Sequence, residues 1–266
     1  MNISEMLGEY ERDYALAMLG VEDFPYQKLS GKTIVVDGES EYMKLTVCMS
    51  LLALNDKEKL SIKVLMLGNG NELSEKLAER NDFSLCSYEQ AAATEYNFFI
   101  STGICGLELN GTSAEYCRIT NNFARAISTA KSCLERCILL SDYRVYGELE
   151  RGLVISENEA GFVPFSNNGD MSQTTAVSIE TYFSAYAKQF NLPTIILRSG
   201  ILLGAKAELP QNFTDELFSA VAEGKQISLP NTRKKYSFTY LNEVIHALLY
   251  AFYEFKENSV FNVISR

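Results

Sequence analysis

The sequence predicts an α/β fold in which helices cover both faces of a parallel, doubly wound sheet. Short runs of β-branched and apolar residues alternate with amphipathic segments of helix length, and four of these runs lead to Gly38, Gly68, Ser101 and Ser141. Strands joined by helices favour parallel pairing with right-handed crossovers, and ligands of such sheets bind at the carboxyl ends of the strands. We therefore expect any functional site at these four positions.

The first unit of this pattern is a strand over 33–36 followed by a helix that reaches Leu54. Such a unit opens dinucleotide-binding folds, where the intervening turn carries glycines that let backbone approach a pyrophosphate. A turn with glycines at its first, fourth and seventh positions would place them at 38, 41 and 44. The sequence has Gly38, Glu41 and Lys44 there, so the scaffold is predicted but two of its glycines are missing.

The following segments continue the alternation. The sequence predicts strands over 62–67, 83–85, 97–101 and 137–141, with helices over 73–78 and 113–132. A polar stretch follows Gly147, and a helix over 171–190 then precedes a strand over 193–198. The remaining pieces are smaller: helices over 213–222 and 241–252, and strands near 227, over 237–238 and over 260–264.

These elements divide the chain into three predicted regions. Residues 1–30 form a lead-in with a helix over 3–19, which is alternatively an association arm. Residues 31–200 form the sheet domain, and residues 201–266 supply a small, truncated cap interleaved with the last strands.

Composition excludes several classes of function. The net charge is −10 and no stretch gathers enough lysine and arginine to bind a phosphate backbone, so no nucleic-acid partner is expected. No apolar run approaches the ~20 residues of a membrane span, and the first residues do not resemble a signal peptide, so the expected location is the cytoplasm. Six scattered cysteines and one histidine predict free thiols and no metal site.

Residues 139–147, Leu-Leu-Ser-Asp-Tyr-Arg-Val-Tyr-Gly, resemble the strand and turn of the extended short-chain dehydrogenase/reductase family, which contains NAD-dependent nucleotide-sugar epimerases and dehydratases. Four further blocks agree with this family in order and spacing: 23–33, 180–193, 196–204 and 238–244. The resemblance covers roughly the whole chain and implies a Rossmann-type sheet domain.

The resemblance also identifies where the catalytic residues of the family would lie. Family members remove a hydride to NAD with help from a tyrosinate, whose pKa a lysine four residues later lowers. These two positions correspond to Ser172 and Ala176, which supply neither a phenol nor a cation. The family's serine or threonine corresponds to Asp142. The aspartate and glutamate of its dehydratases correspond to Tyr143 and Arg144. All five positions therefore depart from the family pattern.

The cofactor positions depart as well. Glu39 and Glu41 place carboxylates at a helix N-terminus that should receive a pyrophosphate, although they alternatively serve only to cap the helix. Gly68 follows the second strand where the family has an aspartate or arginine that contacts the ribose. Ser101 opens the turn where the family has a His-Ala-Ala sequence.

The sequence therefore predicts a degenerate epimerase/dehydratase-like protein that binds no NAD or NADP and serves as a non-catalytic binding or partner subunit. The alternative is an active NAD(P)-dependent nucleotide-sugar 4,6-dehydratase or epimerase with atypical motifs. We also expect Tyr42 or Met43 to fill the vacated cofactor volume. The resemblance further implies association through the helices over 113–132 and 171–190, with a second copy or an active relative, and a nucleotide sugar as a candidate ligand.

Overall fold

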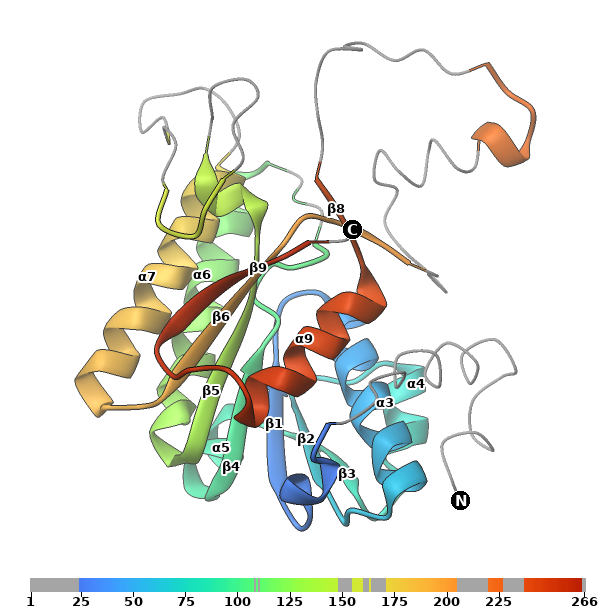
Figure 1. Cartoon of the computed structure of the whole chain (residues 1–266), viewed down its shortest axis with the longest axis vertical. Helices are drawn as coiled ribbons and strands as arrows, with labels where there is room; N and C mark the ends of the chain where they lie inside the picture. The colour runs from blue at the N-terminus through green and yellow to red at the C-terminus, as the bar shows by residue number, and fades with distance from the viewer. Residues whose placement is uncertain are drawn as a thin grey trace.

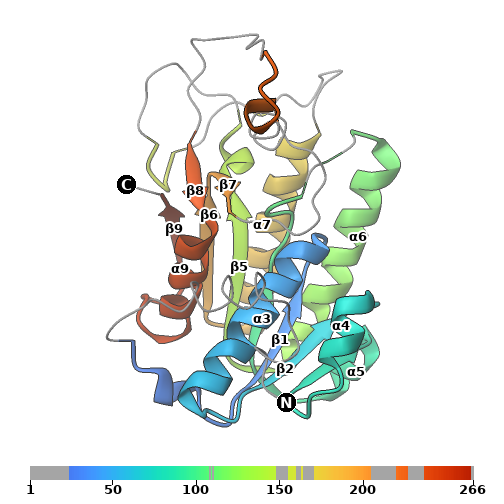
Figure 2. The same ribbon diagram turned by 90° about the vertical axis from the view of Figure 1, so that its right-hand side faces the viewer.

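The structure is a computed structural model that describes residues 24–107, 109, 111–147, 155–159, 163, 171–204, 220–226 and 237–264. The predicted helix over 3–19 and the predicted strand near 227 lie outside these residues, as does most of the predicted helix over 213–222. The described residues form a sheet domain with helices on both faces (Figures 1 and 2).

Seven parallel strands form the large sheet, in the order β3-β2-β1-β4-β5-β6-β9. They span β1 Thr33–Asp37, β2 Lys63–Leu67, β3 Phe83–Cys86, β4 Tyr96–Ser101, β5 Cys133–Asp142, β6 Thr194–Ser199 and β9 Ser259–Val263. Two further strands, β7 Ile201–Leu203 and β8 Phe238–Tyr240, pair with each other in a separate parallel sheet. The predicted doubly wound parallel sheet is thus confirmed.

The helices lie in two layers. The helices are α3 Glu41–Glu58, α4 Glu72–Leu77, α5 Tyr88–Ala93, α6 Ser113–Thr129, α7 Ser172–Phe190 and α9 Leu241–Tyr253, with short 3-10 turns η1 Tyr26–Leu29, η2 Ala130–Ser132 and η3 Tyr143–Tyr146. Helices α3 and α9 cover one face of the sheet, and α6 and α7 cover the other (Figure 1).

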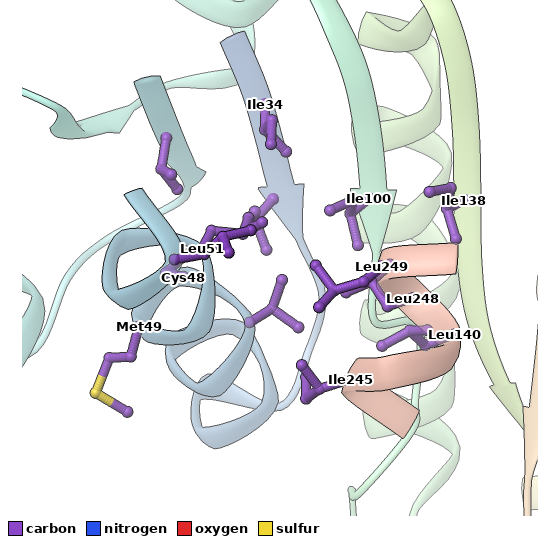
Figure 3. Close-up of a cluster of buried hydrophobic side chains, with 14 of the residues drawn as sticks. Ile34, Cys48, Met49, Leu51, Ile100, Ile138, Leu140, Ile245, Leu248 and Leu249 are labelled. Atoms are coloured by element: carbon purple, nitrogen blue, oxygen red, sulfur yellow. The ribbon is translucent and has the colours of Figure 1, made fainter. Parts of the chain in front are cut away.

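The larger apolar core lies between the sheet and the α3/α9 layer. Ile245, Leu248 and Leu249 of α9 pack toward strand residues such as Ile100 and Ile138 (Figure 3). Burial of such side chains contributes about 1.5–3 kcal/mol each. This packing fixes the strands whose carboxyl ends would form a site.

Helix α3 differs from its predicted amphipathic character, because every residue from Met43 to Asn55 is buried. A helix that is largely apolar on all sides is suited to burial. Its polar side chains contact main-chain groups: Ser50 donates to the Thr46 carbonyl, and Asn55 exchanges hydrogen bonds with the main chain of Ile62.

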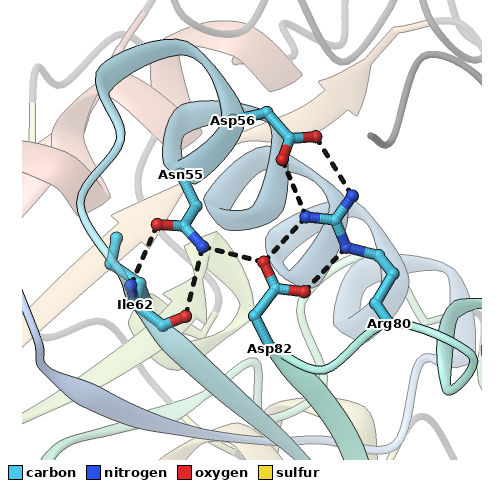
Figure 4. Close-up of polar contacts among 5 residues, drawn as sticks. All are labelled: Asn55, Asp56, Ile62, Arg80 and Asp82. Atoms are coloured by element: carbon cyan, nitrogen blue, oxygen red, sulfur yellow. Dashed lines mark hydrogen bonds and ion pairs between the residues drawn. The ribbon is translucent and has the colours of Figure 1, made fainter. Parts of the chain in front are cut away.

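An ion-pair cluster ties α3 to β3 at the opposite end of the sheet from the strand carboxyl ends. The Arg80 guanidinium contacts Asp56 at 2.8 Å and Asp82 at 2.7 Å, and Asn55 also donates to Asp82 (Figure 4). The Arg80 side chain is 5% exposed. Every acceptor oxygen of the two carboxylates meets a donor in this cluster.

Three elements differ from the sequence prediction. Helix α5 and strand β7 were not predicted, because six and three residues are too few to display a period. Strand β5 begins at Cys133, four residues before its predicted start, because its register shifts opposite Tyr96 and Phe98 and interrupts the alternation. All six cysteines are free thiols, as predicted.

Within the described part of the chain, none of the helices combines the length and apolar character that crossing a membrane requires. The described residues also contain no group of three or more His, Cys, Asp or Glu side chains arranged to hold a metal ion.

Candidate functional site

The candidate site lies at the carboxyl end of the sheet, where β1 and β4 are neighbours but their connections diverge to opposite faces. In doubly wound sheets this switch point is where ligands bind. The register places Asp37 of β1 beside Ser101 of β4, and Asp142 of β5 beside Ser199 of β6. The structure therefore assembles most of the predicted site positions along one edge.

The turns that follow β1 and β4 are bonded directly to each other. The Thr102 amide donates to the Asp37 carbonyl at 2.8 Å, and the Glu39 amide donates to the Gly103 carbonyl at 3.2 Å. Gly38 has φ +148°, and a Cβ placed there would lie 1.9 Å from Thr102 Oγ1. Only glycine fits at position 38, and the Thr102 side chain occupies the space above it.

Asp37 is a buried acid at the centre of this contact. Burial raises the pKa of Asp37 to about 7, with Glu39 adding to the rise while Lys44, the Gly38 amide and Ser101 oppose it. Its nearest side-chain donor is the Ser101 hydroxyl, at 3.4 Å from Oδ2. An acid with this pKa carries a proton for part of the time near neutrality.

Lys44 stands at the third glycine position and reaches across to β2. Its ammonium lies 3.0 Å from Glu41 Oε2 and 3.3 Å from the Leu67 carbonyl oxygen. A Cβ placed on Gly68 would lie 3.8 Å from Lys44 Nζ. Lys44, at the family's third glycine position, thus lies next to Gly68, at the position of the family's aspartate or arginine. The two departures from the family pattern are neighbours in the structure.

At the N-terminus of α3, some of the main-chain amides already have partners within the chain. Ser40 caps the helix by accepting from the Met43 amide at 3.3 Å, and the Glu39 amide is already bonded to Gly103. Glu39 forms an ion pair with Arg118 of α6. Of the predicted roles, the helix cap belongs to Ser40, while Glu39 and Glu41 form ion pairs. These residues do not fit a dinucleotide pyrophosphate, which needs free amides and no carboxylates beside them.

Met43 packs under the same edge. It is fully buried, and a Cβ on Gly106, whose φ is +70°, would lie 2.8 Å from Met43 Cγ. Tyr42 is partly buried against the same core. These contacts agree with a turn packed by its own side chains.

Asp142, at the end of β5, and Arg144, in η3, form an ion pair with each other. The Asp142 carboxylate receives two hydrogen bonds from Arg144 Nε, at 3.0 and 2.9 Å, and one from Arg144 Nη2. The same guanidinium donates to the Ile104 carbonyl at 2.8 Å and the Leu107 carbonyl at 3.2 Å. Burial tends to lower the pKa of Arg144, but Asp142 outweighs it and the pKa rises. Tyr143, between the paired residues, is 45% exposed.

The remaining catalytic positions lie on α7. Ser172 is its first residue and is buried, and Ala176 belongs to the apolar core together with Ile179 and Phe183. Ser141 is also buried, and its carbonyl accepts from the Ser199 hydroxyl at 3.4 Å. Neither Ser172 nor Ala176 presents a group that removes a proton at neutral pH.

A polar network beside this edge was not predicted as a unit. Arg198 of β6 forms a two-bond ion pair with Glu180 of α7, at 3.0 and 2.7 Å, and its guanidinium lies 4.8 Å from the Tyr146 ring centre. The Tyr146 hydroxyl donates to Asn262 of β9. The sequence contains no spacing signal for these contacts, because the four residues lie on separate elements.

The helices α6 and α7 bury most of the apolar residues that suggested a second partner. Phe123, Ala126, Ile127, Ile179 and Phe183 are each at most 4% exposed and form the core beneath the helices. Tyr182 is the exception among the stripe residues on α7, at 45% exposed. These five residues therefore pack against the sheet, and association through the two helices stays a prediction.

Sequence and structure comparisons place this geometry among known proteins. A sequence model described as "NAD dependent epimerase/dehydratase family" matches residues 108–263, more than half of the chain. No curated protein matches by sequence.

Solved structures share the fold. UDP-glucuronic acid 4-epimerase from Bacillus cereus, in complex with NAD, is 17% identical with a TM-score of 0.68, covering 88% of this chain and 77% of that one. UDP-glucose 4-epimerase from Thermotoga maritima, with UDP-glucose, is 16% identical with a TM-score of 0.65 and the same coverage. dTDP-glucose 4,6-dehydratase from Bacillus anthracis, in complex with NAD, is 12% identical with a TM-score of 0.63, covering 88% and 75%.

Proposed function

This chain belongs to the NAD dependent epimerase/dehydratase family, and we propose that it is a non-catalytic member that acts as a binding or partner subunit. The observation that carries the proposal is the Asp142–Arg144 pair. These residues stand at catalytic positions of the family, yet the guanidinium is committed to Asp142 and to the carbonyls of Ile104 and Leu107. A cation held by these partners cannot stabilise charge that develops on a substrate.

The acid–base pair supports the same proposal. General acid–base catalysis needs a group whose pKa lies near the working pH and within hydrogen-bond reach of the reacting proton. Ser172 and Ala176 are buried and offer no such group. Asp37 has a pKa of about 7, but it is buried beneath the bonded turns after β1 and β4. The described residues at the catalytic positions therefore hold the fold together.

We propose further that the chain binds no NAD or NADP. Lys44 and its partner Glu41 occupy the positions of two glycines, and the Glu39 amide is bonded to Gly103. A dinucleotide would have to displace these contacts and approach Glu39 and Glu41.

Calorimetric titration with NAD⁺, NADH and NADP⁺ tests this proposal. We expect no binding heat and no thermal shift, whereas a ligand present at ~100 times its dissociation constant stabilises a protein by about 2.7 kcal/mol. A micromolar dissociation constant, or turnover of a UDP- or dTDP-sugar, would contradict the proposal and favour an active epimerase or dehydratase. That second candidate is supported by Gly38, which keeps the φ of +148° that a phosphate-binding turn uses, and by structural relatives solved with NAD.

The proposed partner surface is the outer face of α6 and α7. Its exposed residues include small side chains and one aromatic ring: Ala114, Cys117, Ala124, Tyr182 and Ala185. A helix pair with small exposed residues permits close approach of a second helix pair. The partner is a second copy or an active relative with the same helices.

A further inference from the structure

The segment Thr102–Leu107, which follows β4, fills the space between three elements of the fold. Gly103 has φ +50°, and a Cβ there would lie 3.1 Å from the Leu140 carbonyl oxygen of β5. A Cβ on Gly106 would meet Met43 of α3 and, at 3.2 Å, Leu202 of β7. At Gly103 and Gly106 the backbone of the segment therefore packs directly against β5, α3 and β7. A side chain added at either glycine would collide with these neighbours.

Internal bonds give this segment a defined shape. The Cys105 amide donates to the Thr102 carbonyl at 2.8 Å, and the Leu107 amide donates to the Ile104 carbonyl at 3.0 Å. These are two successive tight turns, which define the course of the backbone within the segment.

Each end of the segment has its own attachment. At the start, Thr102 and Gly103 exchange backbone hydrogen bonds with Asp37 and Glu39. At the far end, Arg144 donates hydrogen bonds to the carbonyls of Ile104 and Leu107, whose side chains also pack against the core. Since Asp142 holds the guanidinium from the opposite side, Arg144 joins β5 to the segment by charge-assisted hydrogen bonds.

A buried thiol lies under the segment. Cys105 is fully buried, with Sγ 3.5 Å from the Ser199 hydroxyl oxygen. Burial raises the pKa of the Cys105 thiol to about 12, with Asp142 adding to the rise while Ser199 and Arg144 oppose it. The reactive thiolate is therefore almost absent at neutral pH while the segment is closed, and an opened segment would restore it.

We propose that the Asp142–Arg144 pair is a latch that holds the segment Thr102–Leu107 closed over the carboxyl ends of β4, β5 and β6. With the latch in place, the turns after β1 and β4 stay bonded to each other. Releasing Arg144 opens the segment at its Leu107 end while the rest of the sheet stays folded. The latch does not depend on whether the chain binds NAD.

Site-resolved labelling of the full chain with N-ethylmaleimide under native conditions tests the latch. In Arg144→Met we expect Cys105 to react at least about tenfold faster than in the parent protein, as expected for a local opening. Cys48 and Cys137 are also buried, and their rates should rise no more than general destabilisation raises them in the Arg80→Met control below. An unchanged Cys105 rate would overturn the proposal.

Arg80→Met is the matched control, because Arg80 is also a buried arginine held by carboxylates but lies at the other end of the sheet. General destabilisation in this control should raise the rates of all buried cysteines together. If Arg144→Met gives that same uniform pattern, the latch is overturned.

Arg144→Lys keeps the test decisive if Arg144→Met fails to fold. A lysine keeps a positive charge beside Asp142, but its single ammonium lacks the fork that reaches both carbonyls. We expect Cys105 to react several-fold faster than in the parent, with Cys48 unchanged. A Cys105 rate equal to that of the parent would overturn the proposal.

Discussion

Each end of the sheet carries a largely enclosed arginine, Arg80 held by two carboxylates and Arg144 held by one, but the two ends satisfy their polar atoms to different degrees. At the end near β3, Arg80, Asp56, Asp82 and Asn55 satisfy one another (Figure 4). At the carboxyl end, Arg144 is equally well held, but the Thr102 hydroxyl and one Glu41 oxygen are buried and have no hydrogen-bond partner among the described residues.

This difference shows that the carboxyl edge combines an ion pair like those of the opposite end with buried polar atoms that have no partner among the described residues. In α/β proteins, polar groups at the strand carboxyl ends are normally satisfied by ligand and water. Here Lys44 and Arg144 meet partners within the chain. The edge carries ion pairs like those of the opposite end, together with an acid of raised pKa, Asp37, and buried oxygens that have no hydrogen-bond partner among the described residues. These features fit the proposed non-catalytic role.

The largest expected effect comes from removing either arginine. Breaking a buried ion pair on one side costs about 3–5 kcal/mol, because the remaining carboxylate stays buried without its partner. We expect Arg144→Met and Arg80→Met to lower the free energy of unfolding by similar amounts, about 3 kcal/mol each, measured by urea denaturation. If Arg144→Met is nearly neutral while Arg80→Met is costly, the carboxyl end is not a structural end.

The next prediction is that replacing an aspartate changes the stability of the protein in opposite directions at the two ends of the sheet. The folded-state pKa of Asp37 is raised by burial, so the folded protein holds a proton between pH ~4 and ~7 that the unfolded chain has lost. The contribution of Asp37 to the free energy of unfolding therefore falls as the pH rises through that window, and it is constant above it. Asp37→Asn removes this loss and should stabilise the protein by about 2 kcal/mol more at pH 8 than at about pH 5.5.

Asp82→Asn is the control at the other end. Burial tends to raise the pKa of Asp82, but hydrogen bonds from Arg80 and Asn55 outweigh it and the pKa is lowered. Its stabilisation is present above pH ~4 and is lost as the pH falls through its folded pKa. Asp82→Asn should therefore destabilise the protein at pH 8. Equal signs for the two variants in urea titrations at pH 8 would contradict the comparison.

A smaller effect is expected at Lys44. Lys44→Met removes the hydrogen bond to the Leu67 carbonyl and leaves Glu41 without its cation. Because Glu41 is partly exposed, solvent screens the pair, and the expected cost is about 1 kcal/mol. Lys57→Met is the control, since Lys57 meets Glu58 at 3.9 Å on the surface and its loss should change the melting temperature little. Equal melting temperatures for the two variants would exclude a structural role for Lys44.

The same contrast explains how far the sequence alone could go. The strand and helix succession was predictable because buried parallel strands are apolar runs whose period differs from that of helices. That Ser172 and Ala176 stand at the family's tyrosine and lysine positions is a prediction that rests on the family resemblance alone. That Lys44 meets Gly68, and that Arg144 reaches Ile104 and Leu107, was not predictable, because these contacts join residues that are far apart along the chain.

The smallest expected change in monomer stability concerns the outer face of α7, where a polar substitution should act on association alone. Tyr182 is 45% exposed, so Tyr182→Glu should alter the free energy of unfolding by about 0.5 kcal/mol or less. If α6 and α7 form the proposed interface, this change places a charge within it, and light scattering should show dissociation to a monomer of 29.8 kDa. Leu134→Glu is the matched control, because Leu134 is a 60% exposed apolar side chain near the start of β5, outside α6 and α7. It should leave the assembly intact. A parent protein that is already monomeric at high concentration, or equal dissociation by both variants, would remove the helix pair as the partner surface.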